Sequence, residues 1–278
     1  MPDTKELNNL CVDVRADILK MINKAKSGHP GGSLSSTEIV VALYFGGIMN
    51  VRPDDPDWED RDRFILSKGH VNPVVYSVLA RKGFFPMEWL DTLRKLGSPL
   101  QGHPHASLVP GIDCSSGSLG QGLSITNGIA LALKKRGSDA RVYCLMGDGE
   151  LQEGQVWEAA MTAAHHKLDN VCAIVDFNGV QLDGNVNDIK SLGDLAGKWR
   201  AFGWNVIEID GHNMDAVLDA FDLARNTKGA PSVIVAHCIK GKGVSFMEND
   251  CAWHGSAPND AQLEAALKEI YAAKEAEA

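Results

Sequence analysis

The pattern that decides the fold lies in residues 141–178, which read RVYCLMGDGELQEGQVWEAAMTAAHHKLDNVCAIVDFN. The apolar runs at 141–147 and 170–178 are typical of buried strands, and residues 156–166 between them have helical spacing. A strand, a helix and a second strand in this order predict two parallel strands joined by a right-handed crossover. Both strands then end at the same edge of the sheet, where open α/β folds bind their ligands.

Two polar residues stand at these strand ends. Asp148 follows the first strand in a Gly-Asp-Gly turn, and Asn178 ends the second, 30 residues later. One βαβ unit needs about 30 residues, so the carboxylate and the amide oxygen converge. Such hard oxygen donors suit Mg²⁺ or Ca²⁺, and Mg²⁺ completes its coordination with waters and phosphates. Gly149 lets a phosphate approach the backbone. An isolated Gly-Asp-Gly is usually only a turn, but two polar strand ends in succession favour a ligand site.

The same alternation extends to both sides of this unit. Further strands are expected at 63–67, 205–210 and 231–239, and helices at 72–82, 191–202 and 213–227. This order predicts a mostly parallel sheet with helices on both faces. We therefore expect an α/β fold and one domain over residues 1–278, with a helical N-terminal segment and a C-terminal surface helix.

Two segments lie outside the alternation. Residues 1–50 are expected to be helical, with a turn at residues 27–32, and residues 51–63 to form a polar surface loop. Residues 97–122 are rich in Gly, Ser and Pro and carry no charge run. A stretch of that length without regular structure is uncommon in a compact domain and is often functional.

Composition excludes several classes of protein. The formal charge of -9 argues against a nucleic-acid partner or an anionic membrane surface, although it allows a phosphorylated ligand. No segment approaches the roughly 20 apolar residues of a membrane span, and the charged N-terminus does not read as a signal peptide. The six cysteines form no C-x-x-C pair, which suits a reducing compartment. A cytoplasmic location is expected.

Several further motifs carry a family resemblance. Residues 147–184 resemble the thiamine diphosphate motif, which runs from GDG to an Asn about thirty residues later. The other signatures resemble transketolase in particular, and they occur in family order: SGHPGGSLS (27–35), LSKGH (66–70), QGHPH (101–105), SGSLGQGLS (116–124) and AWHGSAP (252–258). The resemblance covers nearly the whole chain and implies the thiamine diphosphate-binding fold of the domain that holds the diphosphate.

The resemblance also implies roles at matching positions. Asp148, Asn178 and the backbone carbonyl of Val180 would bind Mg²⁺, for which Ca²⁺ or Mn²⁺ can substitute. The cofactor contacts would come from Asn178 and from His70, Gly149 and His254 at the diphosphate. Residues 117–119 (Gly117, Ser118 and Leu119) would lie against the aminopyrimidine ring. Glu153 matches a residue at the subunit contact beside the cofactor.

Three histidines would line the substrate channel and act in catalysis: His29, His103 and His254. Gly-rich surroundings support this, since they allow close ligand access, and a neutral imidazole can donate to and accept from sugar hydroxyls. The chain departs from the family at Ser118, where Pro is common, and at His105, where an acidic residue often follows GHP. His165, His166, His212 and His237 are interpreted as surface or core residues without a catalytic role.

The resemblance further implies a missing part. In the family, the glutamate that activates the cofactor ring belongs to a pyrimidine-binding domain, usually of another subunit, and full transketolases carry that domain and a third one on the same chain. This sequence reaches residue 278 without them. We therefore expect the N-terminal subunit of a split transketolase, active with a separate C-terminal subunit in an α₂β₂ assembly. It would transfer a two-carbon ketol unit from a ketose phosphate to an aldose acceptor.

Other functions fit the sequence less well. A dinucleotide site is excluded because no G-x-G-x-x-G joins a strand to a helix. The α subunit of a 2-oxo acid dehydrogenase E1 and a deoxyxylulose-phosphate-synthase-like enzyme share the metal motif, but the histidine motifs favour sugar handling. A regulatory subunit that binds cofactor without turnover is the non-enzyme alternative, and the intact metal and histidine set argues against it.

Overall fold

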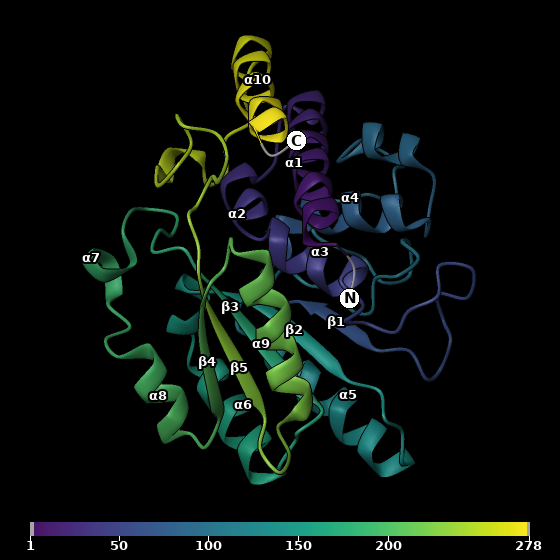
Figure 1. The fold of residues 1–278 in the computed structure, drawn as a ribbon, viewed down its shortest axis with the longest axis vertical. Helices are drawn as coiled ribbons and strands as arrows, with labels where there is room; N and C mark the ends of the chain where they lie inside the picture. Colours follow the sequence, from purple (N-terminus) through teal and green to yellow (C-terminus); the bar gives the residue numbers. More distant parts are fainter. Residues whose placement is uncertain (1–2, 277–278) are drawn as a thin grey trace.

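A five-stranded parallel sheet organises the computed structural model, which describes residues 3–276 (Figure 1). The sheet has the order β1-β2-β3-β5-β4. The strands are β1 (Arg63–Leu66), β2 (Val142–Gly147), β3 (Val171–Phe177), β4 (Asn205–Asp210) and β5 (Ser232–His237). Because every neighbouring pair is parallel, all carboxyl ends lie at one edge. The predicted α/β class with a parallel sheet is confirmed.

Helices cover both faces of the sheet, and side chains alternate between them. Val142, Cys144 and Met146 of β2 belong to one core, whereas Tyr143 and Leu145 belong to the other. The first core also contains side chains of α5 (Gly122–Arg136), α6 (Gly154–His165) and α8 (Leu195–Ala201). The second contains side chains of α1 (Thr4–Ala25), α3 (Thr37–Phe45), α4 (Asn72–Lys82) and α9 (Met214–Asn226).

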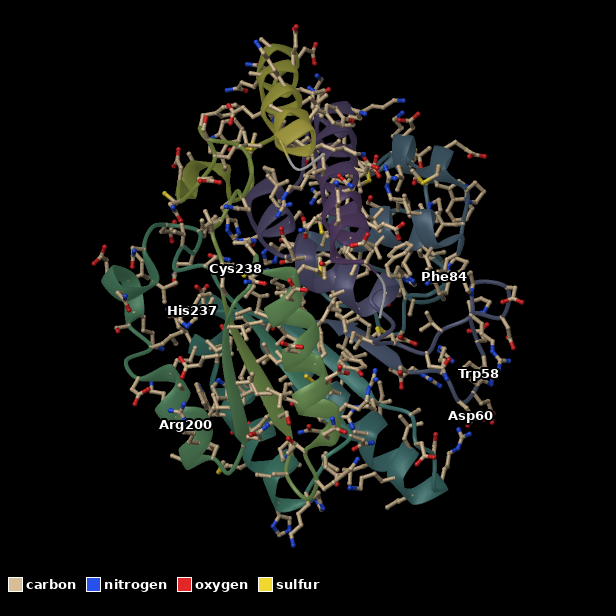
Figure 2. All side chains as sticks on the ribbon, viewed as in Figure 1. Trp58, Asp60, Phe84, Arg200, His237 and Cys238 are labelled. Carbon is tan, nitrogen blue, oxygen red and sulfur yellow. The ribbon has the colours of Figure 1, made fainter. Side chains whose placement is uncertain are left out.

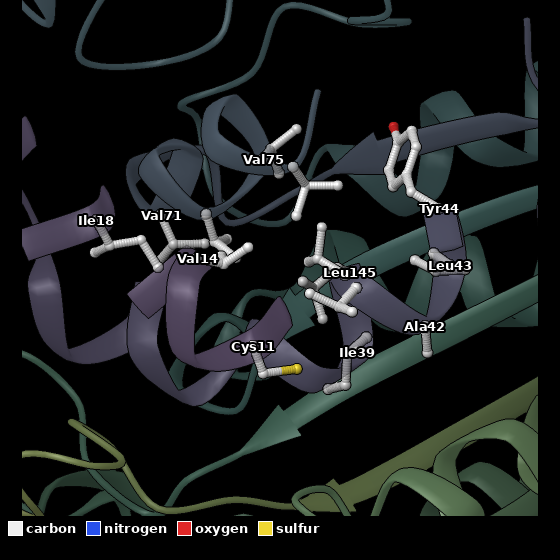
Figure 3. Packing of buried hydrophobic residues seen from close by; sticks show 14 of the residues in the cluster. Cys11, Val14, Ile18, Ile39, Ala42, Leu43, Tyr44, Val71, Val75 and Leu145 are labelled. Atoms are coloured by element: carbon white, nitrogen blue, oxygen red, sulfur yellow. The ribbon is translucent and has the colours of Figure 1, made fainter. Parts of the chain in front are cut away.

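The second core is the larger one. In Figure 3, Val14 of α1, Ile39 of α3 and Val75 of α4 lie around Leu145 of β2, all within this core. Helix α10 (Asp260–Ala276) packs beside α1, far along the chain from it (Figure 1). No helix within residues 3–276 is long and apolar enough to cross a membrane, and no disulfide joins the cysteines in this part of the chain.

Most predicted elements are present, with differences at three places. The turn expected at residues 27–32 is shorter, because Pro30 begins α2 (Pro30–Ser35), as a proline at the first helical position can. The helix expected at 191–202 is α8 alone, and a short helix, α7 (Val186–Lys190), precedes it. Helix α5 was not anticipated. Its residues Gly122 and Gly128 lower helix propensity, so the segment resembles the Gly-rich stretch before it.

Residues 97–121 contain only short irregular turns, as expected, but they are held at several points. The Asp113 carboxylate accepts hydrogen bonds from the Phe64 backbone (2.8 Å) and from the Arg61 guanidinium (2.9 Å). The Ser116 amide donates to the Pro104 carbonyl (3.3 Å). The segment is therefore tied to the start of β1 and returns to the carboxyl edge of the sheet, where α5 begins.

Candidate functional site

A cavity of about 300 Å³ lies at the carboxyl edge of the sheet. Its lining comes from the ends of β1, β2 and β3, from residues 117 and 119, and from segments after β5. Gly32 helps to keep it open, since a Cβ atom there would lie 2.8 Å from Val71 and 4.0 Å from the His70 and Lys68 side-chain nitrogens. Figure 2 labels His237 and Cys238, which mark this edge at the end of β5.

Asp148 lies at the end of β2 and is only 3% exposed. Its carboxylate accepts hydrogen bonds from the Gly149 amide (2.7 Å) and the Gly179 amide (2.6 Å). The second bond joins the end of β2 to the segment after β3, as the predicted crossover requires. Burial and the nearby Asp176 raise the pKa of Asp148 to about 6.

Asn178 is held by a buried carboxylate two residues before it. Asp176 accepts from Asn178 Nδ2 (2.9 Å), from Ser35 Oγ (2.6 Å) and from the Lys68 ammonium. Burial would raise the pKa of Asp176, but Lys68 and these hydrogen bonds outweigh it and hold the pKa below its usual range. Because the Asn178 amide nitrogen is committed to Asp176, its Oδ1 faces away from that carboxylate. Oδ1 accepts from the Val180 amide (3.1 Å), and this single bond among residues 3–276 leaves it a second lone pair.

The Val180 carbonyl lies in a closed loop beside this amide. The loop is pinned by hydrogen bonds from the Val186 amide to the Gly179 carbonyl and from the Gln181 amide to the Gly184 carbonyl, both 2.9 Å. The Lys240 ammonium donates to the Val180 carbonyl (2.8 Å) and approaches His254 Nδ1 at 2.9 Å. Burial lowers the pKa of Lys240 to about 8. Lys240 thus connects the strand-end loop to a histidine.

Three of the predicted histidines form one cluster at the cavity wall. The ring centroids of His29, His70 and His254 are 5.0 to 5.5 Å apart. Burial, with Arg94, lowers the pKa of His29 to about 4, and burial, with Lys240, lowers that of His254 to about 3. Burial and Lys68 also lower the pKa of His70. All three imidazoles are therefore neutral near pH 7.

The other predicted site residues lie at the rim. His103 is exposed on one side and packs beside Gly117 on the other, and this partial burial and the nearby Arg94 lower its pKa. Gly117 and Leu119 line the cavity, whereas Ser118 is exposed and does not. Glu153 is also exposed, at the start of α6 beside Gly120. The structure thus gathers the metal-ligand candidates and three histidines, and leaves His103, Ser118 and Glu153 outside the cavity wall. Their roles stay predictions.

The histidines without an expected catalytic role lie away from the cavity. His165 and His166 are exposed at the end of α6, and His237 ends β5. His212 is different, because Glu38 accepts from its Nδ1 (3.0 Å) and its Nε2 accepts from the Ile239 amide (2.8 Å). Arg15 completes this buried group with Glu38 (2.5 Å). His212 is a satisfied core residue that contacts the segment just before Lys240.

Sequence reasoning overlooked five residues at the site: Lys68, Arg94, Glu150, Asp176 and Lys240. Lys68, Glu150 and Asp176 lie inside or beside quoted motifs, so their polar character next to strand ends was a usable signal. Lys240 follows β5 in a Gly-containing loop, but only the sheet order shows that β5 adjoins β3. For Arg94 the sequence gives no signal, because its place beside His29 depends on the irregular segment.

Comparison with known proteins agrees with this geometry. The family model described as "Transketolase, thiamine diphosphate binding domain" matches residues 7–277. The chain is 45% identical to the 6-deoxy-6-sulfo-D-fructose transketolase subunit of Clostridium sp. (strain MSTE9), over 92% of this chain and 93% of that protein. It is 43% identical to an apulose-4-phosphate transketolase subunit of Phocaeicola vulgatus, over 92% of this chain and 90% of that protein.

Solved structures of transketolases are also similar to this chain. The crystal structure of transketolase from Campylobacter jejuni superposes with a TM-score of 0.91 at 32% identity, over 98% of this chain and 43% of that chain. The chain therefore spans less than half the length of that transketolase, in contrast to its match with the subunit relatives. On the family match and these identities, the chain belongs to the thiamine diphosphate-binding domain family of transketolases.

Proposed function

We propose that this chain is the diphosphate-binding subunit of a two-subunit transketolase that transfers a two-carbon ketol unit from a ketose phosphate to an aldose acceptor. The observation that carries the proposal is the meeting of Asp148, Asn178 and the Val180 carbonyl with three neutral histidines around one cavity. The relatives that it matches over nine-tenths of their length are named as transketolase subunits, which supports a separate partner.

The residues present fit thiamine diphosphate and a divalent cation. Asp148, Asn178 and the Val180 carbonyl supply three oxygens, and no group of three His, Cys, Asp or Glu side chains in residues 3–276 offers a complete metal site. Mg²⁺ normally completes such a partial set with phosphate oxygens and waters, so metal and diphosphate would bind together. Ca²⁺ or Mn²⁺ would fit the same oxygens. The Gly149 backbone and the ammonium groups of Lys68 and Lys240 would lie beside the negatively charged phosphates.

The histidine partners imply how the substrate is held. Lys240 donates to His254 Nδ1, so the neutral ring carries its hydrogen on Nε2. The Arg94 guanidinium lies 3.5 Å from His29 Nδ1, which favours the same tautomer there. Both rings would then offer an Nε2–H donor to a sugar carbonyl or hydroxyl oxygen. The bound cofactor supplies a nucleophilic carbon and an electron sink. Neutral rings avoid a further positive charge beside Lys68 and Lys240.

The remaining machinery would belong to the partner. We infer that a pyrimidine-binding subunit completes the cofactor site and that the two chains form an α₂β₂ assembly in the cytoplasm, without nucleic acid. Leu119, Ile125 and Met161 are exposed apolar side chains on the loop before α5, on α5 and on α6, the helix that begins beside Glu153. They support a protein contact on this side of the cavity.

Reconstitution tests the proposal. The purified chain, a candidate partner chain and their mixture are assayed for ketol transfer with thiamine diphosphate, Mg²⁺ and a panel of ketose phosphate donors and aldose acceptors. Turnover should require both chains. Full turnover by this chain alone contradicts the two-subunit assignment, and decarboxylation of pyruvate in place of ketol transfer contradicts the transketolase assignment.

A further inference from the structure

A second buried carboxylate lines the cavity and takes no part in the proposed metal-ligand set. Glu150 follows the Gly-Asp-Gly turn and is 3% exposed. It forms no ion pair in the described part of the chain. Its Oε2 accepts from the Gly147 amide (3.0 Å), and its Oε1 accepts from the Gly120 amide (2.9 Å) and from the Ser67 hydroxyl. One side chain thus joins the ends of β1 and β2 to the loop before α5.

The loop is built to reach this carboxylate. Gly120 has φ +84°, a left-handed conformation that favours glycine. The Ser67 hydroxyl, which donates to Glu150, accepts in turn from the Gly122 amide (3.1 Å). A Cβ atom at Gly122 would overlap the Ser67 side chain, so the backbone lies directly on it. Two backbone amides of one segment are therefore drawn toward the same buried acidic group.

The two sides that Glu150 connects have different chemistry. The strand-end side carries Asp148 and Gly149, which suit a metal ion and phosphate. The loop side presents Gly117 and Leu119, whose side chain is apolar and 39% exposed. The apolar Leu119 side chain suits an uncharged ring better than a diphosphate.

We propose that Glu150 is a positioning residue that holds loop 117–120 against the strand ends, so that the loop contacts the ring portion of the bound cofactor. The inference rests on the proposed function for the identity of the ligand. Both Glu150 oxygens accept hydrogen bonds from the protein itself, so its contribution should appear in the affinity for the ring portion of the cofactor.

The test compares two ligands on Glu150→Gln and wild type, each mixed with the partner subunit. Thiamine diphosphate and inorganic pyrophosphate, both with Mg²⁺, are titrated by calorimetry. The glutamine amide must turn an N–H toward a donor that the carboxylate accepted, so thiamine diphosphate affinity should fall about tenfold to a hundredfold. Pyrophosphate affinity should change less than about twofold, since the protein groups proposed to bind the diphosphate lie on the strand-end side. Glu264→Gln, at an exposed position of α10, is the matched control and should resemble wild type in its affinity for both ligands.

Hydrogen exchange supplies the structural readout on the full chain without ligand. Gly120 and Gly147 both donate to Glu150, and the Gly120 amide should exchange faster in Glu150→Gln if the new amide nitrogen replaces Oε1, the oxygen that faces the loop. If Glu150→Gln does not fold, Ser67→Ala removes one donor and should give the same ligand pattern at about threefold. Equal loss for both ligands, or no loss for either, overturns the inference. Failure of wild type to bind thiamine diphosphate instead overturns the proposed cofactor.

Discussion

The strand-end group and the histidine group differ in how the chain assembles them. Asp148, Asn178 and the Val180 carbonyl come from a single βαβ unit, and a direct hydrogen bond from Gly179 to Asp148 closes it. His29, His70 and His254 come from three segments spread along nearly the whole chain, and only folding brings their rings within 5.5 Å. The first group is a local structure, whereas the second depends on tertiary packing.

The two groups also have opposite electrostatics. The strand ends contain the buried carboxylates of Asp148 and Asp176, of which only Asp176 is paired with Lys68 in the described residues, whereas the histidines adjoin Lys240 and Arg94. The strand-end group favours a bound cation, whereas the positive charges near the histidine group disfavour protonation of its rings. The strand-end half of the cavity is therefore charged, and the histidine half offers neutral hydrogen-bonding rings. Substitutions in each half should separate these two tasks.

The largest effect is expected at the strand end. Asp148→Asn replaces the only carboxylate among the three metal-ligand candidates and should weaken Mg²⁺-dependent thiamine diphosphate binding by more than about a hundredfold. Loss of a residue that merely supports a metal ligand costs about tenfold to a hundredfold, and a direct ligand should cost more. Calorimetry with the partner subunit measures it. Binding within about threefold of wild type, with and without Mg²⁺, would sink the metal assignment.

A change in the histidine group should separate catalysis from cofactor binding. His29→Asn removes the Nε2–H that is proposed to contact the substrate, and kcat/KM for ketol transfer should fall about a hundredfold. Thiamine diphosphate affinity should stay within about threefold, because the strand-end group is intact. Steady-state kinetics and a cofactor titration on the same preparation give both numbers. A parallel loss of cofactor affinity would show that the two groups are not separable.

This contrast explains what the sequence could predict. The strand-end site followed from spacing, because one parallel crossover fixes where Asp148 and Asn178 lie. Strand positions and α4 followed from apolar periodicity. Helix α5 was missed because Gly122 is demanded by contact with Ser67, a tertiary cause that no local pattern contains.

The histidine group could be named only through motifs resembling a known family, since no spacing rule brings His29 to His254. The motifs also do not indicate which of their residues line the cavity wall and which lie at its rim. Ser118 and Leu119 are neighbours in one motif, yet only Leu119 lines the cavity. Asp176 and Lys240 act through buried hydrogen bonds whose partners are distant in sequence, so their roles required the fold.

Lys240 offers a test of whether the two groups are coupled. Its ammonium contacts the Val180 carbonyl on one side and His254 Nδ1 on the other. Lys240→Met keeps much of the buried side-chain volume and removes both contacts. We expect about a tenfold loss in cofactor affinity and a comparable loss in kcat, since hydrogen bonds to charged groups contribute about 1.5–3 kcal/mol. A loss in only one of the two quantities would show that Lys240 serves one group alone.

The smallest expected effect concerns Arg94, which lies outside the cavity but lowers the pKa of His29 together with burial, the larger cause. Arg94→Gln removes the positive charge and keeps a polar side chain. The pKa of His29 should therefore rise from about 4 but remain below 6.5, because the ring stays buried. Histidine NMR titration of the full chain measures this directly. An unchanged or lower pKa would contradict the electrostatic account.

The same variant has a consequence for stability against pH. In the unfolded chain His29 takes up a proton near pH 6.5, whereas in the folded chain it does so only near pH 4. The free energy of unfolding that depends on neutral His29 is therefore present above pH 6.5 and is lost as the pH falls from 6.5 toward 4. Arg94→Gln brings the folded-state pKa of His29 closer to its unfolded-state value. The free energy of unfolding of the variant should therefore fall less than that of wild type between about pH 7 and pH 5. Urea unfolding of both proteins at the two pH values measures this change. The variant also loses the hydrogen bond from Arg94 to Ser27, but that loss is the same at both pH values. The difference between the two pH values therefore reports only the effect of the Arg94 charge on His29. An equal or larger difference in the variant would assign the lowered pKa to burial alone.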